Sequence, residues 1–344
     1  MNKHLFAGGI TPLGFIDYFD NIMPLDKARK RYFLKGSSGS GKSTFMKKIA
    51  QEMNEQGISL NIYHCANDAK SIDAIASEDF CIIDATRPHI KDPEVPVAID
   101  EVIDFAQFLD YDKLIKNVGE IKKILKEKSD VLYMANKYLK SAGDIYTTHK
   151  KNKERMMQKK YIKELASNLI PFSKNGYEAN DTKFFLDAIT PEGYKSLSNE
   201  YFAGSKIYAI NTPYMAYIDY FLEIIKKDAH KKGITTTSFI CPITNVIKYL
   251  YLKEVNTTFA YKHDVYGISI AYDEEINLSN SFTWNTEVDK IFIKTLNEAT
   301  KQLKESKIIH TRLEEIYIEA MDFSGMEKLH KIVLKEAIKD THHQ

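Results

Sequence analysis

The segment GSSGSGKS at Gly36 to Ser43 constrains this chain more than any other feature, because its glycines, lysine and serine have the spacing of a phosphate-binding loop. A short apolar run, Arg31 to Lys35, precedes it, and STFMKKIAQEMNEQ follows with helical spacing until Gly57. A strand, a glycine-rich loop and a helix in this order let backbone N–H groups surround phosphate oxygens. The sequence therefore predicts a Walker A site for a nucleoside triphosphate.

The predicted nucleotide site consists of Gly36, Ser37, Ser38, Gly39, Ser40, Gly41, Lys42, Ser43 and Thr44. In such a loop Lys42 would contact the β- and γ-phosphates, and the Ser43 hydroxyl would coordinate Mg²⁺. Thr44 follows in the first turn of the helix. The predicted cofactors are therefore ATP and Mg²⁺, and the alternative is an ordinary turn rich in glycine and serine.

Asp84 ends the short apolar run DFCIID and is the best Walker B candidate. An acid at the carboxyl end of a buried strand points into the crevice where sheets of this type hold ligands. The following residues, DATRPH, place Arg87 nearby, where its charge would stabilise the γ-phosphate. The predicted catalytic residues are Lys42, Asp84 and Arg87, and the predicted metal ligands are Ser43 and Asp84. The alternatives are a turn aspartate and a surface arginine.

Two further acids, Asp68 and Asp73, lie in the segment HCANDAKSID. Either carboxylate could orient an attacking water or hydroxyl. The alternative, which the sequence favours, is that they cap a short helix at Ser71 to Ala76.

Strand and helix patterns alternate along the first third of the chain, with strands expected at Ile58 to His64 and Asp79 to Asp84. Such alternation predicts an α/β fold, a parallel sheet covered by helices on both faces. Beyond Pro96, apolar residues recur at heptad-like spacing among lysines and glutamates, which predicts a helical hairpin over about residues 112–170 that breaks near Ser129 and Asp130. A similar stripe predicts helices over about residues 286–340. Helix packing is the favoured interpretation, and a protein partner or self-association through the hairpins is the alternative.

Three matches in the same order indicate that the chain is an internal repeat. FAGGITPLGF from Phe6 recurs as FLDAITPEGY from Phe185, and YFLKGSSGSGKST from Tyr32 aligns with YAINTPYMAYIDY from Tyr208. ANKYLK from Ala135 aligns with ATKQLK further on. The predicted domains are residues 1–182 and 183–344, each a P-loop-type sheet with an appended helical hairpin. Chance similarity between short periodic segments is the alternative.

The second copy lacks the phosphate-binding residues. Lys42 aligns with Ile218 and Ser43 with Asp219, while Tyr217 replaces a loop glycine. Bulky side chains block backbone approach to phosphate, and a carboxylate repels it. We therefore expect the second copy to be a degenerate repeat that binds no nucleotide.

Composition argues against several classes of partner. Lys and Arg number 48 against 47 Asp and Glu, so the net charge of +1 does not favour a nucleic-acid or membrane partner. The three cysteines form no CxxC pair, and no apolar run approaches the roughly 20 residues that span a bilayer. A cytoplasmic location is the expectation.

These motifs resemble a family of bacterial proteins with tandem P-loop domains, described as ATPases or nucleotide-kinase-related proteins. The resemblance covers most of the chain and rests on FAGGITPLG, LKGSSGSGKSTFMKKI, the His64–Cys65 pair, DATRPH and DPEVPVAIDE. It implies ATP binding and a duplicated fold. Both copies in that family commonly carry a phosphate loop, whereas only the first copy does here.

Three functions fit the sequence. The favoured one is a slow ATPase whose nucleotide state changes the fit between the two copies. The second is a kinase that transfers the γ-phosphoryl group to a small acceptor, and the third is a nucleotide-stabilised scaffold without turnover. The chain contains no LSGGQ-type signature, which argues against an ABC transporter ATPase, and no NKxD-type motif, which favours ATP over GTP.

Overall fold

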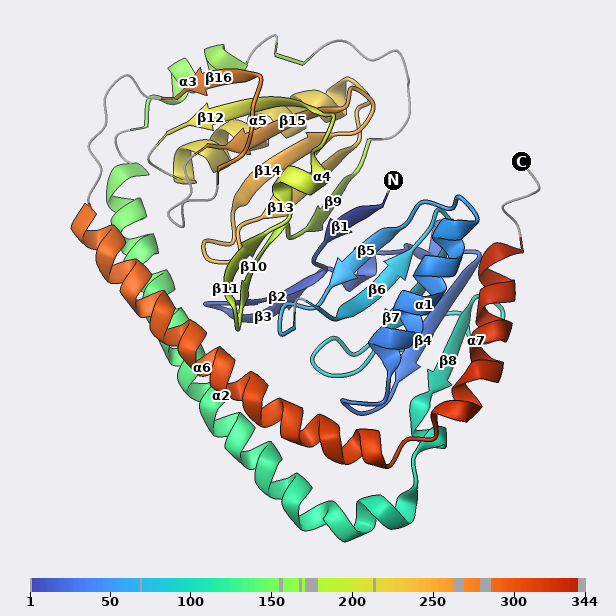
Figure 1. Ribbon diagram of the computed structural model, residues 1–344. Coiled ribbons are helices and arrows are strands. Elements are labelled where there is room, and N and C mark those ends of the chain that lie inside the picture. Colours follow the sequence, from blue (N-terminus) through green and yellow to red (C-terminus); the bar gives the residue numbers. More distant parts are fainter. Residues whose placement is uncertain are drawn as a thin grey trace.

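The computed structural model describes residues 2–68, 70–154, 157–166, 169–170, 179–212, 215–262, 269–278 and 286–339. Over these residues the chain forms two six-stranded sheets, two short hairpins and a pair of long helices that runs along both sheets (Figure 1). The predicted α/β class is confirmed, because each sheet contains parallel strand pairs and is flanked by helices. Residues 155–156, 167–168 and 340 of the predicted helical segments lie outside the described residues.

The first sheet has the strand order β1-β5-β6-β7-β4-β8. Its strands are β1 (Lys3–Leu5), β4 (Lys30–Lys35), β5 (Asn61–His64), β6 (Ile72–Ala76), β7 (Phe80–Asp84) and β8 (Asp100–Asp104). β6 is antiparallel to both of its neighbours, and the other pairs are parallel. The prediction of a wholly parallel sheet is therefore wrong. The connections on either side of β6 are too short for the crossover of a dozen or more residues that parallel neighbours require.

The prediction of a short helix at Ser71 to Ala76 is also wrong, because this segment forms strand β6. All five residues of β6 are buried, including Asp73. A strand buried on both faces does not show the alternation of apolar and polar residues that identifies a strand in a sequence.

The second sheet has the order β16-β12-β15-β14-β13-β9. Its strands are β9 (Asp181–Phe184), β12 (Lys206–Asn211), β13 (Thr236–Ile240), β14 (Ile247–Leu252), β15 (Thr257–Tyr261) and β16 (Glu274–Asn277). β14 is antiparallel to both neighbours, as β6 is in the first sheet, and the other pairs are parallel. Taken in chain order, the strands of the two sheets thus occupy equivalent places.

Each sheet is accompanied by a hairpin with the same turn. The hairpins are β2 (Gly8–Thr11) with β3 (Gly14–Asp17) and β10 (Asp187–Thr190) with β11 (Gly193–Ser196). The hydroxyl of Thr11 donates to the carbonyl of Gly14 at 2.7 Å, and that of Thr190 donates to the carbonyl of Gly193 at 2.8 Å. Short elements complete this part of the chain: η1 (Phe19–Asn21), η2 (Leu25–Lys27), η3 (Phe105–Phe108) and α4 (Ser198–Tyr201).

The two halves meet along an approximate two-fold axis. The N–H of Phe6 donates to the carbonyl of Phe185 at 2.9 Å, and the N–H of Phe185 donates back to the carbonyl of Phe6 at 3.0 Å. Phe6 and Phe185 are also the first residues of the aligned segments in the sequence. Reciprocal contact between equivalent residues is the mark of a two-fold interface.

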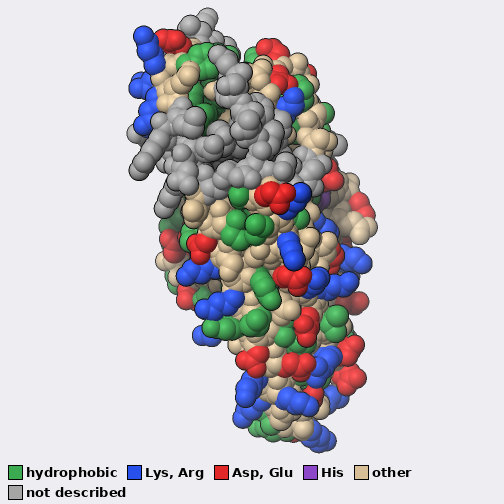
Figure 2. All heavy atoms as spheres, turned by 90° about the vertical axis from the view of Figure 1, so that its left-hand side faces the viewer, with side chains coloured by type: hydrophobic (Ala, Val, Ile, Leu, Met, Phe, Trp, Pro, Cys, Tyr) green, Lys and Arg blue, Asp and Glu red, His purple; other side chains and the backbone are tan. Residues whose placement is uncertain are grey.

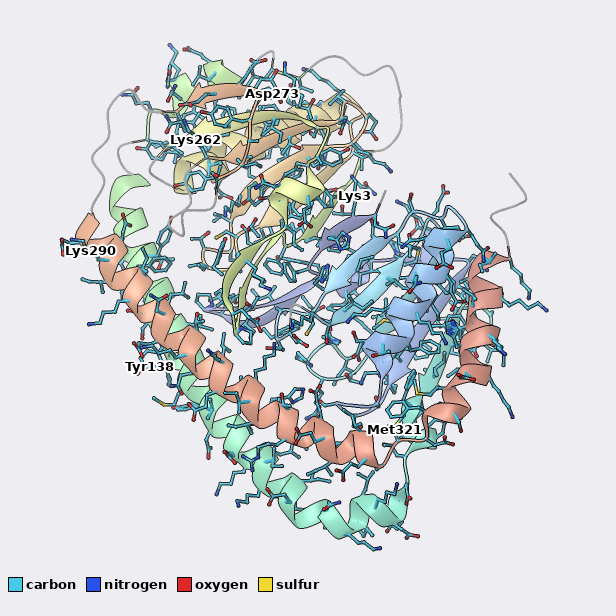
Figure 3. All side chains as sticks on the ribbon, in the orientation of Figure 1. Lys3, Tyr138, Lys262, Asp273, Lys290 and Met321 are labelled. Atoms are coloured by element: carbon cyan, nitrogen blue, oxygen red, sulfur yellow. The ribbon has the colours of Figure 1, made fainter. Side chains whose placement is uncertain are left out.

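The two faces of the first sheet pack against different partners. One face packs on α1 (Lys42–Glu55), through Leu34, Phe45, Ile49, Met53, Ile75 and Ile82. The other face contributes Phe33 and Ile83 to a core that also contains Phe239 of the second sheet. At the same junction the ammonium of Lys3 lies 4.6 Å from the ring centres of Tyr201 and Tyr251 (Figure 3). The prediction that helices cover both faces is thus wrong for the inner face, which packs on the second half.

Two long helices, α2 (Tyr111–Glu154) and α6 (Thr286–Glu319), lie side by side along both halves (Figure 1). α2 continues through Ser129 and Asp130, so the predicted hairpin within the first copy is wrong. Neither residue breaks a helix as glycine or proline does, and the apolar stripe of α2 is buried against α6 instead. The buried side chains of the pair include Ile121, Ile124, Ala135, Leu139, Ala142, Phe292, Leu296, Ala299, Leu303, Ile309 and Leu313.

The helix that follows each long helix packs on the opposite half. After α6, α7 (Phe323–Ile338) packs on α1 and buries Met326 and Val333 in the core of the first sheet. After α2, α3 (Lys159–Ala166) packs on α5 (Met215–Lys231) of the second half. The proposed boundary between residues 182 and 183 stays a prediction, and β9 of the second sheet begins just before it.

The pairing of α2 with α6 predicts that Leu139→Ala lowers the free energy of unfolding by about 2–5 kcal/mol, because Leu139 is fully buried. Leu125→Ala, the same change on the same helix, is the control, since Leu125 is 48% exposed and its loss leaves no cavity. Urea denaturation of both variants measures the difference. Equal costs at the two positions would contradict the packing described.

Candidate functional site

The phosphate loop connects the end of β4 with the start of α1, as the strand–loop–helix pattern predicts. Gly39 has φ +76° and Gly41, which precedes α1, has φ +84°. Residues other than glycine rarely adopt this left-handed backbone conformation, so both positions favour glycine. A Cβ on Gly39 would also lie 2.6 Å from the carbonyl oxygen of Glu314, and one on Gly41 would lie 3.2 Å from Met326. Gly39 is therefore required both for the backbone conformation and for the close approach of the α6 backbone, whereas at Gly41 the backbone conformation is the main requirement.

Lys42 and Asp84 are brought together at this loop. The Lys42 ammonium lies 3.7 Å from Oδ2 of Asp84, and the two side chains are 8% and 16% exposed. The ammonium also donates to the carbonyls of Gly36 at 3.2 Å and Ser37 at 2.8 Å. The pairing arises because β7 lies next to β4, with Asp84 opposite Leu34 at the carboxyl end of both strands. An acid at the end of one strand, beside a lysine that follows the loop after the adjacent parallel strand, matches the Walker A and Walker B arrangement.

The oxygen atoms of Ser43 and Asp84 are those that a magnesium site requires. The hydroxyl oxygen of Ser43 accepts a hydrogen bond from the N–H of Ile72 at 3.0 Å. Oδ1 of Asp84 accepts from the N–H and the hydroxyl of Thr86, and Oδ2 faces Lys42. Among the described residues no group of three or more His, Cys, Asp or Glu side chains is placed to hold a metal. One hydroxyl and one carboxylate suit Mg²⁺, which takes its other ligands from phosphate and water.

Asp73 and His89 form a buried polar pair beside Asp84. Nε2 of His89 lies 3.8 Å from Oδ2 of Asp73, and Nδ1 of His89 donates to the carbonyl of Asp84 at 2.6 Å. The His89 ring stacks on Phe19 with centroids 4.5 Å apart. Burial raises the pKa of Asp73 to about 6, a shift that the charge of His89 opposes and that of Asp84 supports. The favoured role of Asp73 as a helix cap is wrong, since Asp73 is a strand residue beside the phosphate loop.

Three other predicted residues are placed differently. The side chain of Arg87 is exposed and makes no ion pair within the described residues, so its catalytic role stays a prediction. Thr44 is exposed in the first turn of α1. Asp68 accepts hydrogen bonds from Ser71 in the loop before β6, and it pairs with Lys307 of α6 at 2.9 Å.

Helices from the end of the chain cover the phosphate loop, which the sequence did not predict. The α6 backbone at Glu314 lies against Gly39, and Phe323 and Met326 of α7 lie against Gly41. α7 begins just after Met321, which bridges to Leu109 before the start of α2 (Figure 3). No local pattern signals contacts across more than 270 residues. These contacts arise because α6 runs from the second half to the first, where α7 then packs on α1.

The equivalent position in the second half has different chemistry. Ile218 and Tyr217 are buried, where the first half has Lys42 and a loop glycine. Oδ1 of Asp219 accepts from the N–H of Ile247 at 3.1 Å, as the Ser43 hydroxyl does from Ile72. Residues 213–214 of the aligned loop lie outside the described residues. The helix-to-strand contact is thus retained although the phosphate-binding side chains are replaced.

Comparisons with known proteins support a P-loop NTPase-type domain. A family model described as RNA helicase matches residues 32–137, from β4 through the phosphate loop and β8 into α2. The matched segment is less than a third of the chain. No curated protein and no solved structure matches the chain. None of the described helices is both long enough and apolar enough to cross a membrane.

The close approach of α6 predicts that Gly39→Ala lowers the free energy of unfolding more than Gly57→Ala does. Both glycines have left-handed φ values, of +76° and +81°, so each substitution incurs a backbone cost of about 1 kcal/mol. A Cβ at Gly57 has no atom within 4 Å, whereas one at Gly39 collides with the α6 backbone. Chemical denaturation of the two variants measures the excess. If Gly57→Ala costs as much as Gly39→Ala, the helix does not press on the loop.

Proposed function

We propose that the chain binds Mg-ATP at Gly36 to Thr44 and hydrolyses it slowly. The observation that carries this proposal is the position of Asp84, 3.7 Å from Lys42 at the mouth of a GxxxxGKS loop. Lys42 would bind the β- and γ-phosphates, and Ser43 and Asp84 would hold Mg²⁺, which supplies charge neutralisation when bound. Loop N–H groups and the start of α1 would bind the remaining phosphate oxygens.

We propose that binding and hydrolysis of the nucleotide change how the two halves pack against each other. α6 and α7 touch the loop at Gly39 and Gly41, and the same α6 continues along α2 to the second half. A ligand that alters the loop must therefore be accommodated by these helices. Coupling of this kind requires that the ligand bind one arrangement of the helices more tightly than another.

We further propose that the halves arose by duplication, with residues 1–182 and 183–344 as the two copies. The equal strand order of the sheets and the reciprocal Phe6–Phe185 bonds support this history. A tandem P-loop family of the kind that the sequence resembles would account for both. The second copy would serve as a packing partner, with Ile218 and Asp219 in place of the phosphate-binding pair.

Phosphoryl transfer is a second candidate reaction, and one observation favours it. A cavity of about 520 Å³ lies between α1 and strands β1, β5 and β6, lined by His4, Lys47, Ala50, Gln51, Asn54, Glu55, Ile62, His64 and Ile72. Ile72 is the residue whose N–H binds the Ser43 hydroxyl. A small acceptor in this cavity would lie near the proposed metal site.

One experiment separates these reactions. The purified chain is incubated with Mg²⁺ and γ-labelled ATP, alone, with a panel of nucleosides and nucleotides, and with single-stranded RNA. Hydrolysis predicts label in free phosphate in every sample. We expect no stimulation by RNA, because the net charge of the chain is only +1 and basic and acidic side chains are interspersed on the one face that Figure 2 shows. Label in an acceptor would establish that the protein is a kinase. Phosphate release that depends on RNA would establish an ATPase with an RNA partner, as in a helicase. Binding of ATP without release of the label would indicate a scaffold without turnover.

Lys42→Ala is expected to weaken Mg-ATP binding by about 2–3 kcal/mol, because it removes the charge that the loop directs at the terminal phosphates. Lys48→Ala, an exposed lysine of the same helix, is the control and should bind normally. Calorimetry of both folded variants gives the comparison. Wild-type affinity in Lys42→Ala would place the nucleotide elsewhere.

Asp84→Asn is expected to reduce turnover far more than binding, since a metal-orienting carboxylate acts mainly on charge that develops in the transition state. The measurements are the hydrolysis rate over a range of Mg²⁺ concentrations and the affinity for a non-hydrolysable analogue. A wild-type rate with wild-type Mg²⁺ dependence would show that Asp84 is only a structural partner of Thr86 and Lys42.

Titration with an ATP analogue should fit one site per chain, because only the first half has a lysine and a hydroxyl at the loop. The stoichiometry is fitted freely to calorimetric data from the full chain, and Lys42→Ala should weaken binding at that single site. Two sites of comparable affinity would show that the second half has its own means of binding phosphate.

A further inference from the structure

Lys128 of α2 extends across the helix pair to the turn of α6 that covers the phosphate loop. Its ammonium donates to Nδ1 of His310 at 2.7 Å. Nε2 of His310 lies 3.7 Å from the carboxylate of Glu314, one turn further along α6. The backbone of Glu314 is the part of α6 that lies against Gly39. The ammonium of Lys128, carried by α2, therefore lies against the turn of α6 that packs on the nucleotide loop.

The charge of Lys128 is poorly compensated. Burial, together with the charges of Lys128 and Lys42, lowers the pKa of His310 to about 4, so the ring is neutral at pH 7 and accepts the hydrogen bond. Burial also lowers the pKa of Lys128 itself, an effect that the charge of Glu314 opposes. Within the part of the chain that the structure describes, no carboxylate lies within ion-pair distance of this ammonium.

The neighbouring Lys307 provides the contrast. Lys307 also lies on α6 near the loop, but it pairs with Asp68 at 2.9 Å and with Glu192 at 2.5 Å. Two carboxylates pair with Lys307, whereas the hydrogen-bond partner of Lys128 is a neutral imidazole and the carboxylate of Glu314 acts on it only from beyond ion-pair distance. Partly buried charges are normally paired directly, so Lys128 can take an anion at closer range than Glu314.

We propose that Lys128 binds the terminal phosphate groups of the nucleotide, from the helix pair opposite Lys42. This inference rests on the proposed binding of Mg-ATP at the phosphate loop. A triphosphate held in the loop beside α6 would supply the direct ion pair that Lys128 lacks, and His310 would hold the ammonium in place beforehand. A second cation at the γ-phosphate, delivered by an element outside the loop, is how P-loop NTPases stabilise charge during transfer. Nucleotide binding would then join α2 and α6 to the first sheet.

The test is Lys128→Met, with Lys126→Met as the control because Lys126 is an exposed lysine on the same helix. Calorimetry measures the affinity of each folded variant for a Mg-bound non-hydrolysable ATP analogue and for Mg-ADP. Lys128→Met should weaken the ATP analogue by about tenfold or more and ADP by less, while Lys128→Arg should retain most of the affinity. The melting temperature of the nucleotide-free variant should not fall, since a partly buried charge without a direct ion pair has been removed.

Two results would overturn the inference. One is unchanged affinity of Lys128→Met for the ATP analogue. The other is a lower melting temperature with equal losses for the ATP analogue and ADP, which would make Lys128 a structural link between α2 and α6. Should Lys128→Met fail to fold, acylation of the wild-type chain decides: the analogue should protect Lys128 and leave Lys126 unchanged, and equal labelling of Lys128 with and without the analogue refutes the contact.

Lys42→Ala, measured in parallel, separates this inference from the function beneath it. If Lys42→Ala loses the analogue while Lys128→Met binds it like the wild type, only the role of Lys128 is wrong. If wild type and Lys42→Ala show the same affinity, the proposed site is wrong and the role of Lys128 falls with it.

Discussion

The pairing of α2 with α6 is the interaction on which the arrangement of this molecule depends. Each helix begins beside one sheet and ends beside the other, and α7 and α3 then cover the helices α1 and α5 of the opposite half. Apolar side chains at heptad-like spacing are buried between the two helices. Arg312 on α6 also pairs with Glu120 and Glu127 on α2. These exposed ion pairs contribute little to stability, so the buried apolar contacts hold the pair together. Neither sheet can complete its helical cover without the chain of the other half.

This exchange explains why the candidate site is made from distant parts of the chain. The phosphate loop comes from the first fifty residues, yet its glycines are packed by Glu314, Phe323 and Met326. Lys128 and His310 come from the two long helices. A triphosphate in the loop would therefore meet α2 and α6 as well as α1. The second half needs no nucleotide of its own to respond, because α6 connects it directly to the loop.

The parts of the structure that the sequence predicted are those determined by local chemistry. The glycine spacing predicted the loop, the run ending in Asp84 predicted a buried strand, and their neighbouring positions in the sheet bring Lys42 and Asp84 together. The threonine–glycine turns and the aligned phenylalanines likewise appear at equivalent places in both halves. In each case a few adjacent residues specify the geometry.

What could not be predicted depends on contacts between distant segments. β6 is buried on both faces, so Asp73 gave no periodic signal and its place beside Asp84 follows from an antiparallel pairing. The 3,4 spacing of α2 predicted a helix partner but not which helix, and a hairpin within one copy satisfies the same pattern as a pair between copies. α7 reaches the loop because α2 pairs with α6 of the other copy. The sequence around Gly41 contains no pattern that predicts this contact.

A nucleotide bound by the first half should act on α6, because α6 packs on the phosphate loop. Hydrogen exchange of the full chain, with and without a Mg-bound non-hydrolysable ATP analogue, tests it most directly. We expect greater protection both in the phosphate loop and in α6 over residues 307–319, with neither change in Lys42→Ala. Protection confined to residues 36–55, with α6 unaffected, would contradict the claim.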